Sequence, residues 1–223
     1  LPILDPGTRT IKVQAEIANP SGRLKPEMFG RIRHSHGSET ASAVAAVPAS
    51  GDRPWCYISS GTWSLMGVEA KHPVINQQCL EMNLTNEIGV EGRIRLLKNI
   101  AGLWIVQECR RQWLLEGREY SYAELTEMAA GAPPFLAVID PDQFIEPGDM
   151  PRRIADFCRK TGQPIPESHA QFIRIALESL ALRYRQVLEM IEKLTGIRTE
   201  VIHIVGGGSR NGLLNQFVAD ATG

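Results

Sequence analysis

Three consecutive glycines follow the clearest strand of the chain and precede a helix. The stretch 201–205 reads Val-Ile-His-Ile-Val, Gly206, Gly207 and Gly208 come next, and Ser209 is predicted to open an amphipathic helix. Glycines let a ligand approach the backbone closely, and free N–H groups at a helix N-terminus favour a phosphate. A tight turn with a serine cap is the alternative interpretation, and this stretch alone favours neither.

Two common phosphate motifs are absent from the sequence. No Gly-x-x-x-x-Gly-Lys-Ser/Thr segment occurs, which excludes a Walker loop. The dinucleotide-binding pattern also fails, because Asn211 stands where a third glycine should follow Gly206 and Gly208. A phosphate-binding fold of another kind is therefore needed.

A second turn combines hydroxyl groups with free amides. Ser60, Gly61 and Thr62 lie between two apolar runs, and residues 55–68 are predicted to form a β-hairpin around them. Such a tip can grip phosphate oxygens, although any tight turn also favours Ser and Gly.

A polar cluster precedes an alanine-rich run that ends at Pro48. Ser38, Glu39 and Thr40 stand where they could cap this predicted helix, or where Glu39 could present a carboxylate at a cleft. On spacing alone, the cap is the better interpretation.

Composition excludes several classes of partner. The net charge is −1 and no basic run occurs, so nucleic acid and anionic membranes are not expected partners. No apolar run approaches the length of a membrane helix, and a cytoplasmic location is expected. The four cysteines are far apart and show no Cys-x-x-Cys pairing, which predicts reduced thiols and no zinc site.

The elements that must position these turns are also visible. A short strand is predicted at 93–97, and a helix at 103–115 carries Gln107 among apolar neighbours. A capping box at Ser168 and Gln171 opens a long helix that stops at Gly196. Its predicted core stripe, with steps of three and four, is Ile173, Leu177, Leu180, Tyr184, Val187, Ile191 and Leu194. On the 103–115 helix, the residues expected at helical spacing are Leu103, Val106, Gln107, Arg110 and Leu114. Smaller helices are expected at 122–130 and 151–160.

Together these pieces resemble the rhamnulokinase branch of the FGGY carbohydrate kinases, over about residues 35–223. The motifs that carry the resemblance are Thr40-Ala-Ser-Ala-Val, Ser59-Ser-Gly-Thr-Trp-Ser-Leu-Met-Gly, Thr85-Asn-Glu, Arg95-Leu-Leu-Lys-Asn-Ile, Gly102-Leu-Trp, His203-Ile-Val-Gly-Gly-Gly and Leu214-Asn-Gln.

The resemblance implies a fold, a domain plan and an activity. The fold would be α/β, the ribonuclease H-like or actin-like ATPase domain of an FGGY sugar kinase. Residues 1–35 would be an inter-domain segment from a missing first domain, and residues 36–223 an incomplete C-terminal nucleotide-binding domain. The full-length protein would phosphorylate a ketose with ATP and Mg²⁺, and L-rhamnulose would become L-rhamnulose 1-phosphate.

The resemblance also assigns roles to individual residues. Glu39 would be the catalytic base, with Ser38, Thr40 and Asn99 on the sugar side. No residue is assigned as a metal ligand. The nucleotide would be held by Ser60, Gly61, Thr62, Gln107, Gly206, Gly207, Gly208 and Asn211.

Two departures from the family pattern keep alternatives open. The family has an Asp preceded by His where this chain has Glu39 preceded by Ser38, and the chain is read as a fragment. Glu reaches about one methylene further than Asp, and a misplacement near 1 Å can cost about a hundredfold in rate. The alternatives are another FGGY ketose or polyol kinase, and a catalytically degenerate fragment that binds nucleotide or a protein.

Overall fold

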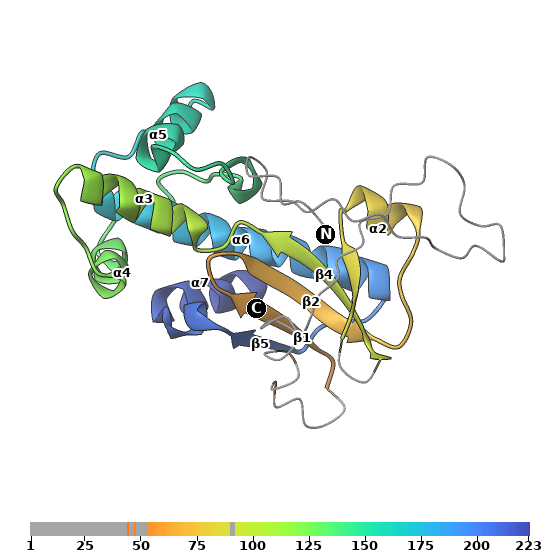
Figure 1. The fold of residues 1–223 in the computed structure, drawn as a ribbon. Helices are drawn as coiled ribbons and strands as arrows, with labels where there is room; N and C mark the ends of the chain where they lie inside the picture. The colour runs from red at the N-terminus through yellow and green to blue at the C-terminus, as the bar shows by residue number, and fades with distance from the viewer. Residues whose placement is uncertain (1–43, 45–46, 48–52, 90–91) are drawn as a thin grey trace, which may run out of the picture. The chain divides into compact units, whose positions relative to one another are not determined.

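The described residues form a five-stranded mixed sheet whose strand ends carry the two turns (Figure 1). The computed structural model describes Val44, Val47 and residues 53–89 and 92–223, all within one compact unit, Ser35–Gly223. The strands follow the order β3-β4-β2-β1-β5. They are β1 (Trp55–Ser60), β2 (Ser64–Ala70), β3 (Thr85–Ile88), β4 (Ile94–Ile100) and β5 (Val201–Val205).

The strand register brings several strand ends to one edge of the sheet. β1 and β2 form the predicted antiparallel hairpin, in which Ser60 is opposite Ser64. β4 runs antiparallel to β2 and places Ile100 opposite Ser64. β5 runs parallel to β1 and places Val205 opposite Ser59. The turn after β1 and the loop after β5 therefore leave the sheet side by side.

Most helices occupy the connections between these strands, and α7 follows the last strand. Helix α6 crosses one face of the sheet beside α7 (Figure 1). Helices α3, α4 and α5 lie to one side of the sheet (Figure 1). The helices are α2 (Gln77–Glu81), α3 (Trp104–Leu115), α4 (Tyr122–Ala130), α5 (Met150–Lys160), α6 (His169–Thr195) and α7 (Gly212–Thr222), with short 3₁₀ turns η2 (Pro141–Gln143) and η3 (Gly207–Arg210).

The predicted boundaries of α6 are confirmed. Ser168 accepts a hydrogen bond from Gln171 N–H, and the Gln171 side chain reaches back to the cap, which completes the capping box. Gly196 ends the helix with φ 70°, a left-handed conformation in which a residue without Cβ is least strained.

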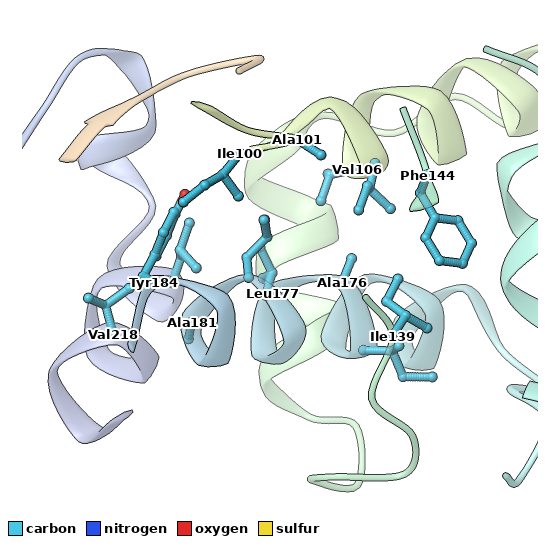
Figure 2. Packing of buried hydrophobic residues seen from close by; sticks show 14 of the residues in the cluster. Ile100, Ala101, Val106, Ile139, Phe144, Ala176, Leu177, Ala181, Tyr184 and Val218 are labelled. Carbon is cyan, nitrogen blue, oxygen red and sulfur yellow. The ribbon is translucent and has the colours of Figure 1, made fainter. Parts of the chain in front are cut away.

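The core lies between α6 and the sheet. Figure 2 shows Leu177, Ala181 and Tyr184 of α6 facing Ile100 of β4 and Val218 of α7, and all of them belong to one buried cluster. Each fully buried side chain of Leu or Ile size contributes about 1.5–3 kcal/mol relative to exposure, so this interface dominates the stability of the domain.

Two sequence expectations about helices are wrong in detail. Ser209 does not cap α7, because η3 intervenes and Ser209 Oγ donates to Gly206 O at 2.7 Å. Asn211 is the cap, and its Oδ1 accepts from Leu214 N–H at 3.0 Å. The apolar stripe of α3 is also different, since Leu114 is 48% exposed and the buried positions are Ile105, Val106, Glu108, Cys109 and Trp113.

The strand predicted at 93–97 is longer and has an unpredicted neighbour. Lys98 and Asn99 continue β4 opposite Met66 and Leu65, because a polar residue does not end a strand whose ladder continues. β3 is an outermost strand of the sheet and pairs with β4. Neither β3 nor α2 is visible in the sequence as a periodic run.

The cysteines agree with the prediction of reduced thiols. Cys56, Cys79, Cys109 and Cys158 are buried and free. Burial, followed by the negative charge of Glu192, raises the pKa of Cys56 to about 12, so this thiol is unreactive near neutral pH. Among the described residues, no cluster of three or more His, Cys, Asp or Glu side chains could hold a metal ion, and no helix has the length and apolar character to cross a membrane.

Candidate functional site

The two predicted turns pack directly against each other at the sheet edge. A Cβ added at Gly206 would lie 2.6 Å from Ser60 O, and one added at Gly208 would lie 2.1 Å from Ser60 Oγ. Gly206 also has φ 88°, which favours glycine. The glycines at these positions are thus required by the close approach of the two backbones.

The predicted nucleotide residues divide into surface and packing members. Thr62, Gly206 and Gly207 are exposed, and a Cβ at Gly207 would meet no atom within 4 Å. Ser60 is only 2% exposed and Gly208 is buried. A ligand at this edge would therefore meet the backbone of the exposed members, while Ser60 and Gly208 hold the two turns together.

The N-terminus of α3 fastens the hairpin turn. Leu103 N–H donates to Gly61 O and Trp104 N–H donates to Thr62 O, both at 2.9 Å. Gly102 has φ 60° and lies so close that a Cβ there would be 2.7 Å from Thr62 O. Two of the orphan donors at the start of α3 are therefore used by the turn.

Gln107 binds the turn through its side chain. Its Nε2 donates to Thr62 Oγ1 at 2.9 Å. The amide thus orients the Thr62 hydroxyl, and its Oε1 has no hydrogen bond to another described side chain. The sequence marked both residues as nucleotide ligands, and the structure brings them into contact.

The electrostatics of this edge favour an anion. The segments 59–64 and 205–211 contain no acidic residue and include Arg210. Both α3 and α7 begin here, so the positive ends of two helix dipoles lie beside the turns. Asn211 caps α7 and also donates from Nδ2 to Thr126 Oγ1 of α4 at 3.4 Å, which ties the glycine loop to that helix.

Asn99, predicted on the sugar side, lies one strand away from the hairpin turn. It is half-buried in β4 opposite Leu65, one position before the Ile100–Ser64 pair. The Asn99 side chain forms no hydrogen bond with another described residue. Its neighbour Lys98 points to the opposite face of the sheet, as strand alternation requires.

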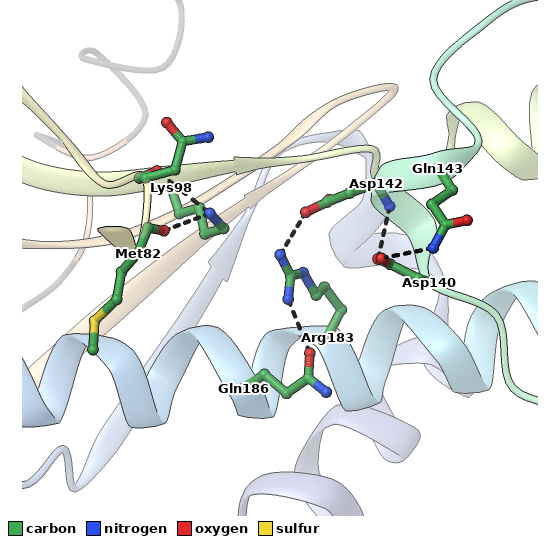
Figure 3. Close-up of polar contacts among 8 residues, drawn as sticks. Met82, Lys98, Asp140, Asp142, Gln143, Arg183 and Gln186 are labelled. Carbon is green, nitrogen blue, oxygen red and sulfur yellow. Dashed lines mark hydrogen bonds and ion pairs between the residues drawn. The ribbon is translucent and has the colours of Figure 1, made fainter. Parts of the chain in front are cut away.

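A polar cluster beneath β4 has a structural role (Figure 3). Lys98 Nζ donates to Met82 O at 2.7 Å, and burial, followed by the positive charge of Arg183, lowers the pKa of Lys98. Arg183 of α6 forms an ion pair with Asp142 of η2. These contacts hold α2 and η2 against the sheet and α6.

The residues predicted to do the chemistry lie outside the described residues. Glu39, the predicted base, and its neighbours Ser38 and Thr40 are all in this group. The site at the two turns is therefore built without these three residues.

Two features of the site were not assigned from the sequence. Ser64 Oγ and Tyr184 Oη form a buried hydrogen bond of 2.7 Å directly behind the hairpin turn. The available signal was a hydroxyl inside the apolar stripe of the long helix, since a buried tyrosine usually finds a partner for its O–H. The second is Gly102, whose signal was a glycine between a strand and a helix.

The two main pockets of the described residues lie away from the two turns. Pockets of about 350 and 240 Å³ occur elsewhere among the described residues, one beside Asp140, Arg183 and Gln186 and the other between β5 and α7. Neither is lined by the turn 61–63 or the glycines 206–208. Small-molecule sites are usually concave, so a second surface would be needed to enclose a ligand here.

Comparison with protein families gives two matches. The model described as the FGGY family of carbohydrate kinases, C-terminal domain, matches residues 56–223. A second model, described as a CusB-like, beta-barrel domain, matches residues 1–38. The first match contains every described element from the second residue of β1 onward.

Several curated proteins are similar to the chain, and each of them is named rhamnulokinase. One from Bacteroides thetaiotaomicron is 53% identical over 84% of this chain and 38% of its own length. One from Enterococcus faecalis is 44% identical over 82% of this chain and 37% of its own length. One from Oceanobacillus iheyensis is 41% identical over 91% of this chain and 43% of its own length. The chain therefore spans less than half of these relatives.

Solved structures share the fold at low identity. A xylulose kinase from Rhodospirillum rubrum matches with a TM-score of 0.60 and 18% identity, over 82% of this chain and 36% of its own. A xylulose kinase from Bifidobacterium adolescentis matches with a TM-score of 0.52 and 17% identity, over 80% and 34%. These likenesses confirm the predicted α/β, actin-like ATPase fold class.

Proposed function

The chain belongs to the FGGY family of carbohydrate kinases, and from this premise we propose that it is the nucleotide-binding part of an enzyme that transfers the γ-phosphoryl group of ATP to a ketose. The observation that carries the proposal is the joining of two phosphate-type turns at one sheet edge, beside the N-termini of α3 and α7. Phosphoryl transfer depends on positioning and on stabilising negative charge, and this edge can supply both.

The division into exposed and buried members supports distinct roles for the turn residues. Gly61 and Thr62 would bind the outer phosphates, and Gly206 and Gly207 would let the inner phosphate and ribose approach the backbone. Ser60 and Gly208 would fix the spacing between these two groups. Gln107 would orient Thr62 with Nε2 and present Oε1 to the nucleoside, with Asn211 nearby at the cap of α7.

The proposed reaction needs a base on the sugar side. A hydroxyl oxygen of the ketose would form a bond to the γ-phosphorus, the bond from that phosphorus to the β–γ bridging oxygen would break, and ADP would leave. Glu39 would accept the proton of the hydroxyl, with Ser38, Thr40 and Asn99 contacting the sugar. The assignments of Ser38, Glu39 and Thr40 rest on the resemblance at the Thr40-Ala-Ser-Ala-Val segment, and that of Asn99 on the resemblance at Arg95-Leu-Leu-Lys-Asn-Ile.

Mg²⁺ would accompany ATP, and the described residues contain no cluster of three or more His, Cys, Asp or Glu side chains that could hold it alone. Mg²⁺ in kinases is bound largely by substrate phosphates and waters with one or two carboxylates, so the metal would arrive with the nucleotide.

We propose that residues 36–223 form an incomplete nucleotide-binding domain and that residues 1–35 connect it to a further domain. The relative from Oceanobacillus iheyensis aligns with 91% of this chain, a share that residues 39–223 alone cannot supply. Kinase similarity thus extends into the segment that also matches the CusB-like model.

The free, buried cysteines support a reducing, cytoplasmic setting.

L-Rhamnulose is the proposed substrate, because the curated relatives at 41–53% identity are named rhamnulokinase. The test is a coupled ADP-release assay on the full-length protein that carries this chain. ADP release should depend on L-rhamnulose and be slower with L-fuculose, D-xylulose or glycerol. A preference for another of these sugars would instead favour a different FGGY kinase. The chain alone should release no ADP in response to sugar, since it spans less than half the length of the curated relatives.

Variants of Glu39 separate a working kinase from a degenerate one. Glu39→Gln in the full-length protein should lower kcat by about 10²–10⁴ while leaving nucleotide affinity nearly intact, because the carboxylate would act on the sugar. Glu39→Asp should preserve or raise kcat. A wild-type kcat in Glu39→Gln would exclude Glu39 as the base, and an inactive wild type that Glu39→Asp activates would identify a catalytically impaired protein.

A further inference from the structure

We propose that Tyr184 is a positioning residue that holds the hairpin turn in its phosphate-binding conformation through Ser64, without touching the nucleotide. The inference rests on the proposed function for its consequence in binding. The claim that Tyr184 holds the hairpin turn does not depend on a ligand and can be tested without one.

The hydroxyl of Tyr184 lies behind the base of the turn. Ser60 and Ser64 are paired residues at the ends of β1 and β2, so their side chains project from the same face of the sheet, toward α6. Tyr184 rises from α6 toward β4, with its oxygen beside Ile100 (Figure 2). Its Oη makes a 2.7 Å hydrogen bond with Ser64 Oγ.

This hydrogen bond is shielded from water. Ser64 is completely buried and Tyr184 is 1% exposed. Burial raises the pKa of Tyr184, and the hydroxyls of Ser64 and Ser60 offset only part of that rise, so the phenol stays protonated at neutral pH. Ser60 Oγ is buried nearby but makes no hydrogen bond of normal geometry. Loss of the Tyr184 hydroxyl would leave Ser64 without its buried partner.

The turn itself has few other supports. Its carbonyls accept from Leu103 N–H and Trp104 N–H, and the Thr62 hydroxyl accepts from Gln107. All three of these contacts come from α3, on one side of the turn. Tyr184 supplies the contact from α6, so the turn is held between two helices. Loss of the Tyr184 contact should let Gly61 and Thr62 move while the sheet remains folded.

Leu103 and Trp104 provide a reporter that needs no nucleotide. They stand at the start of α3, where N–H groups lack partners within the helix, so their protection from hydrogen exchange comes from the turn carbonyls. In the full-length protein, Tyr184→Phe should speed exchange at these two amides about fivefold to tenfold, the effect of losing a buried hydrogen bond. Exchange at Val74 N–H, which donates to Asn86 Oδ1, should not change.

Tyr120→Phe is the matched control, because it also deletes a tyrosine hydroxyl that has a partner. Tyr120 Oη bonds His169 Nδ1 at 3.0 Å and makes no contact with the turn. Tyr120→Phe should leave exchange at Leu103 and Trp104 unchanged. Ser64→Ala should reproduce the effect of Tyr184→Phe, and the double variant should add nothing further, as expected for two groups acting as one pair.

Nucleotide affinity then tests the functional part. The affinity for a non-hydrolysable ATP analogue should fall about fivefold in Tyr184→Phe, with adenosine affinity unchanged, since only the phosphate turn has loosened. Equal losses for both ligands would show a merely structural role and overturn the inference. Unchanged exchange at Leu103 and Trp104 would also overturn it, whatever the ligands do. A wild-type protein that binds neither ligand would refute the proposed function, while the exchange result would still decide whether Tyr184 holds the turn.

Discussion

The two turns at the sheet edge are built by different means. The hairpin turn 61–63 is held by hydrogen bonds from other elements. Leu103 N–H, Trp104 N–H and the Gln107 amide donate to it, and Tyr184 shares a hydrogen bond with Ser64 at its base. The glycine loop 206–208 is held by its own close packing on Ser60, with no Cβ in the way. One turn therefore depends on hydrogen bonds from neighbouring elements and the other on the absence of side chains.

This difference predicts which substitutions each turn tolerates. In the glycine loop, adding a methyl group should be costly at two positions and harmless to stability at the third. In the hairpin turn, deleting a polar group should cost little stability and should act mainly on ligand binding.

The largest expected effect is that of alanine at Gly206 or Gly208. Each added Cβ would overlap Ser60, and Gly206→Ala would also hold a non-glycine residue at φ 88°. Either variant should lower the free energy of unfolding by about 2–4 kcal/mol, measured by urea denaturation. Gly207→Ala is the control, and it should stay within about 0.5 kcal/mol because its Cβ would meet open space. Equal losses at all three glycines would contradict the packing account.

A second prediction separates binding from stability at Gly207. Gly207→Val should lower ADP affinity at least about tenfold, since its side chain would stand where the nucleotide is proposed to approach the backbone. The free energy of unfolding should change little. Isothermal titration of the full-length protein measures the affinity. Gly131→Val serves as a control on an exposed glycine at the end of α4 and should bind ADP normally. Normal ADP binding by a folded Gly207→Val variant would place the site elsewhere.

The smallest effects are expected in the hairpin turn. Thr62→Val removes the hydroxyl that Gln107 orients, and it should lower affinity for an ATP analogue about threefold without changing adenosine affinity. Gln107→Ala should lower the affinity for both ligands, because its Oε1 is proposed to contact the nucleoside. If Gln107→Ala leaves adenosine affinity unchanged, then Gln107 acts only by holding Thr62.

Much of the fold was predictable because its signals are local. The capping box at Ser168 and Gln171, the stop at Gly196 and the apolar stripe of α6 all lie within one element, and the structure confirms them. The short strand β3 and helix α2 were not predictable in this way. β3 forms because β4 offers it a partner, and that pairing is not visible as a period in four residues. Helix α7 begins later than the predicted start at Ser209. The Ser209 hydroxyl donates to Gly206 O, and Asn211 takes the capping role.

The site was predictable to a lesser degree. The residue types at Gly61, Thr62 and Gly207 indicate a phosphate site, and the parallel register of β1 and β5 brings the two turns together. The sequence could not separate Ser60 and Gly208 as packing residues, since their burial depends on each other across nearly 150 positions of chain. Tyr184 was read only as a member of a core stripe, because its partner Ser64 is distant in sequence.

The central claim is that one nucleotide engages both turns at once, and amide hydrogen exchange of the full-length protein with and without nucleotide tests it most directly. ADP should slow exchange at 205–211, and a non-hydrolysable ATP analogue should slow it further at 59–64, where the outer phosphates are proposed to bind. Residues 138–142, beside the pocket of about 350 Å³, should be unaffected. Protection confined to 138–142, or none at either turn with bound nucleotide, would contradict the account.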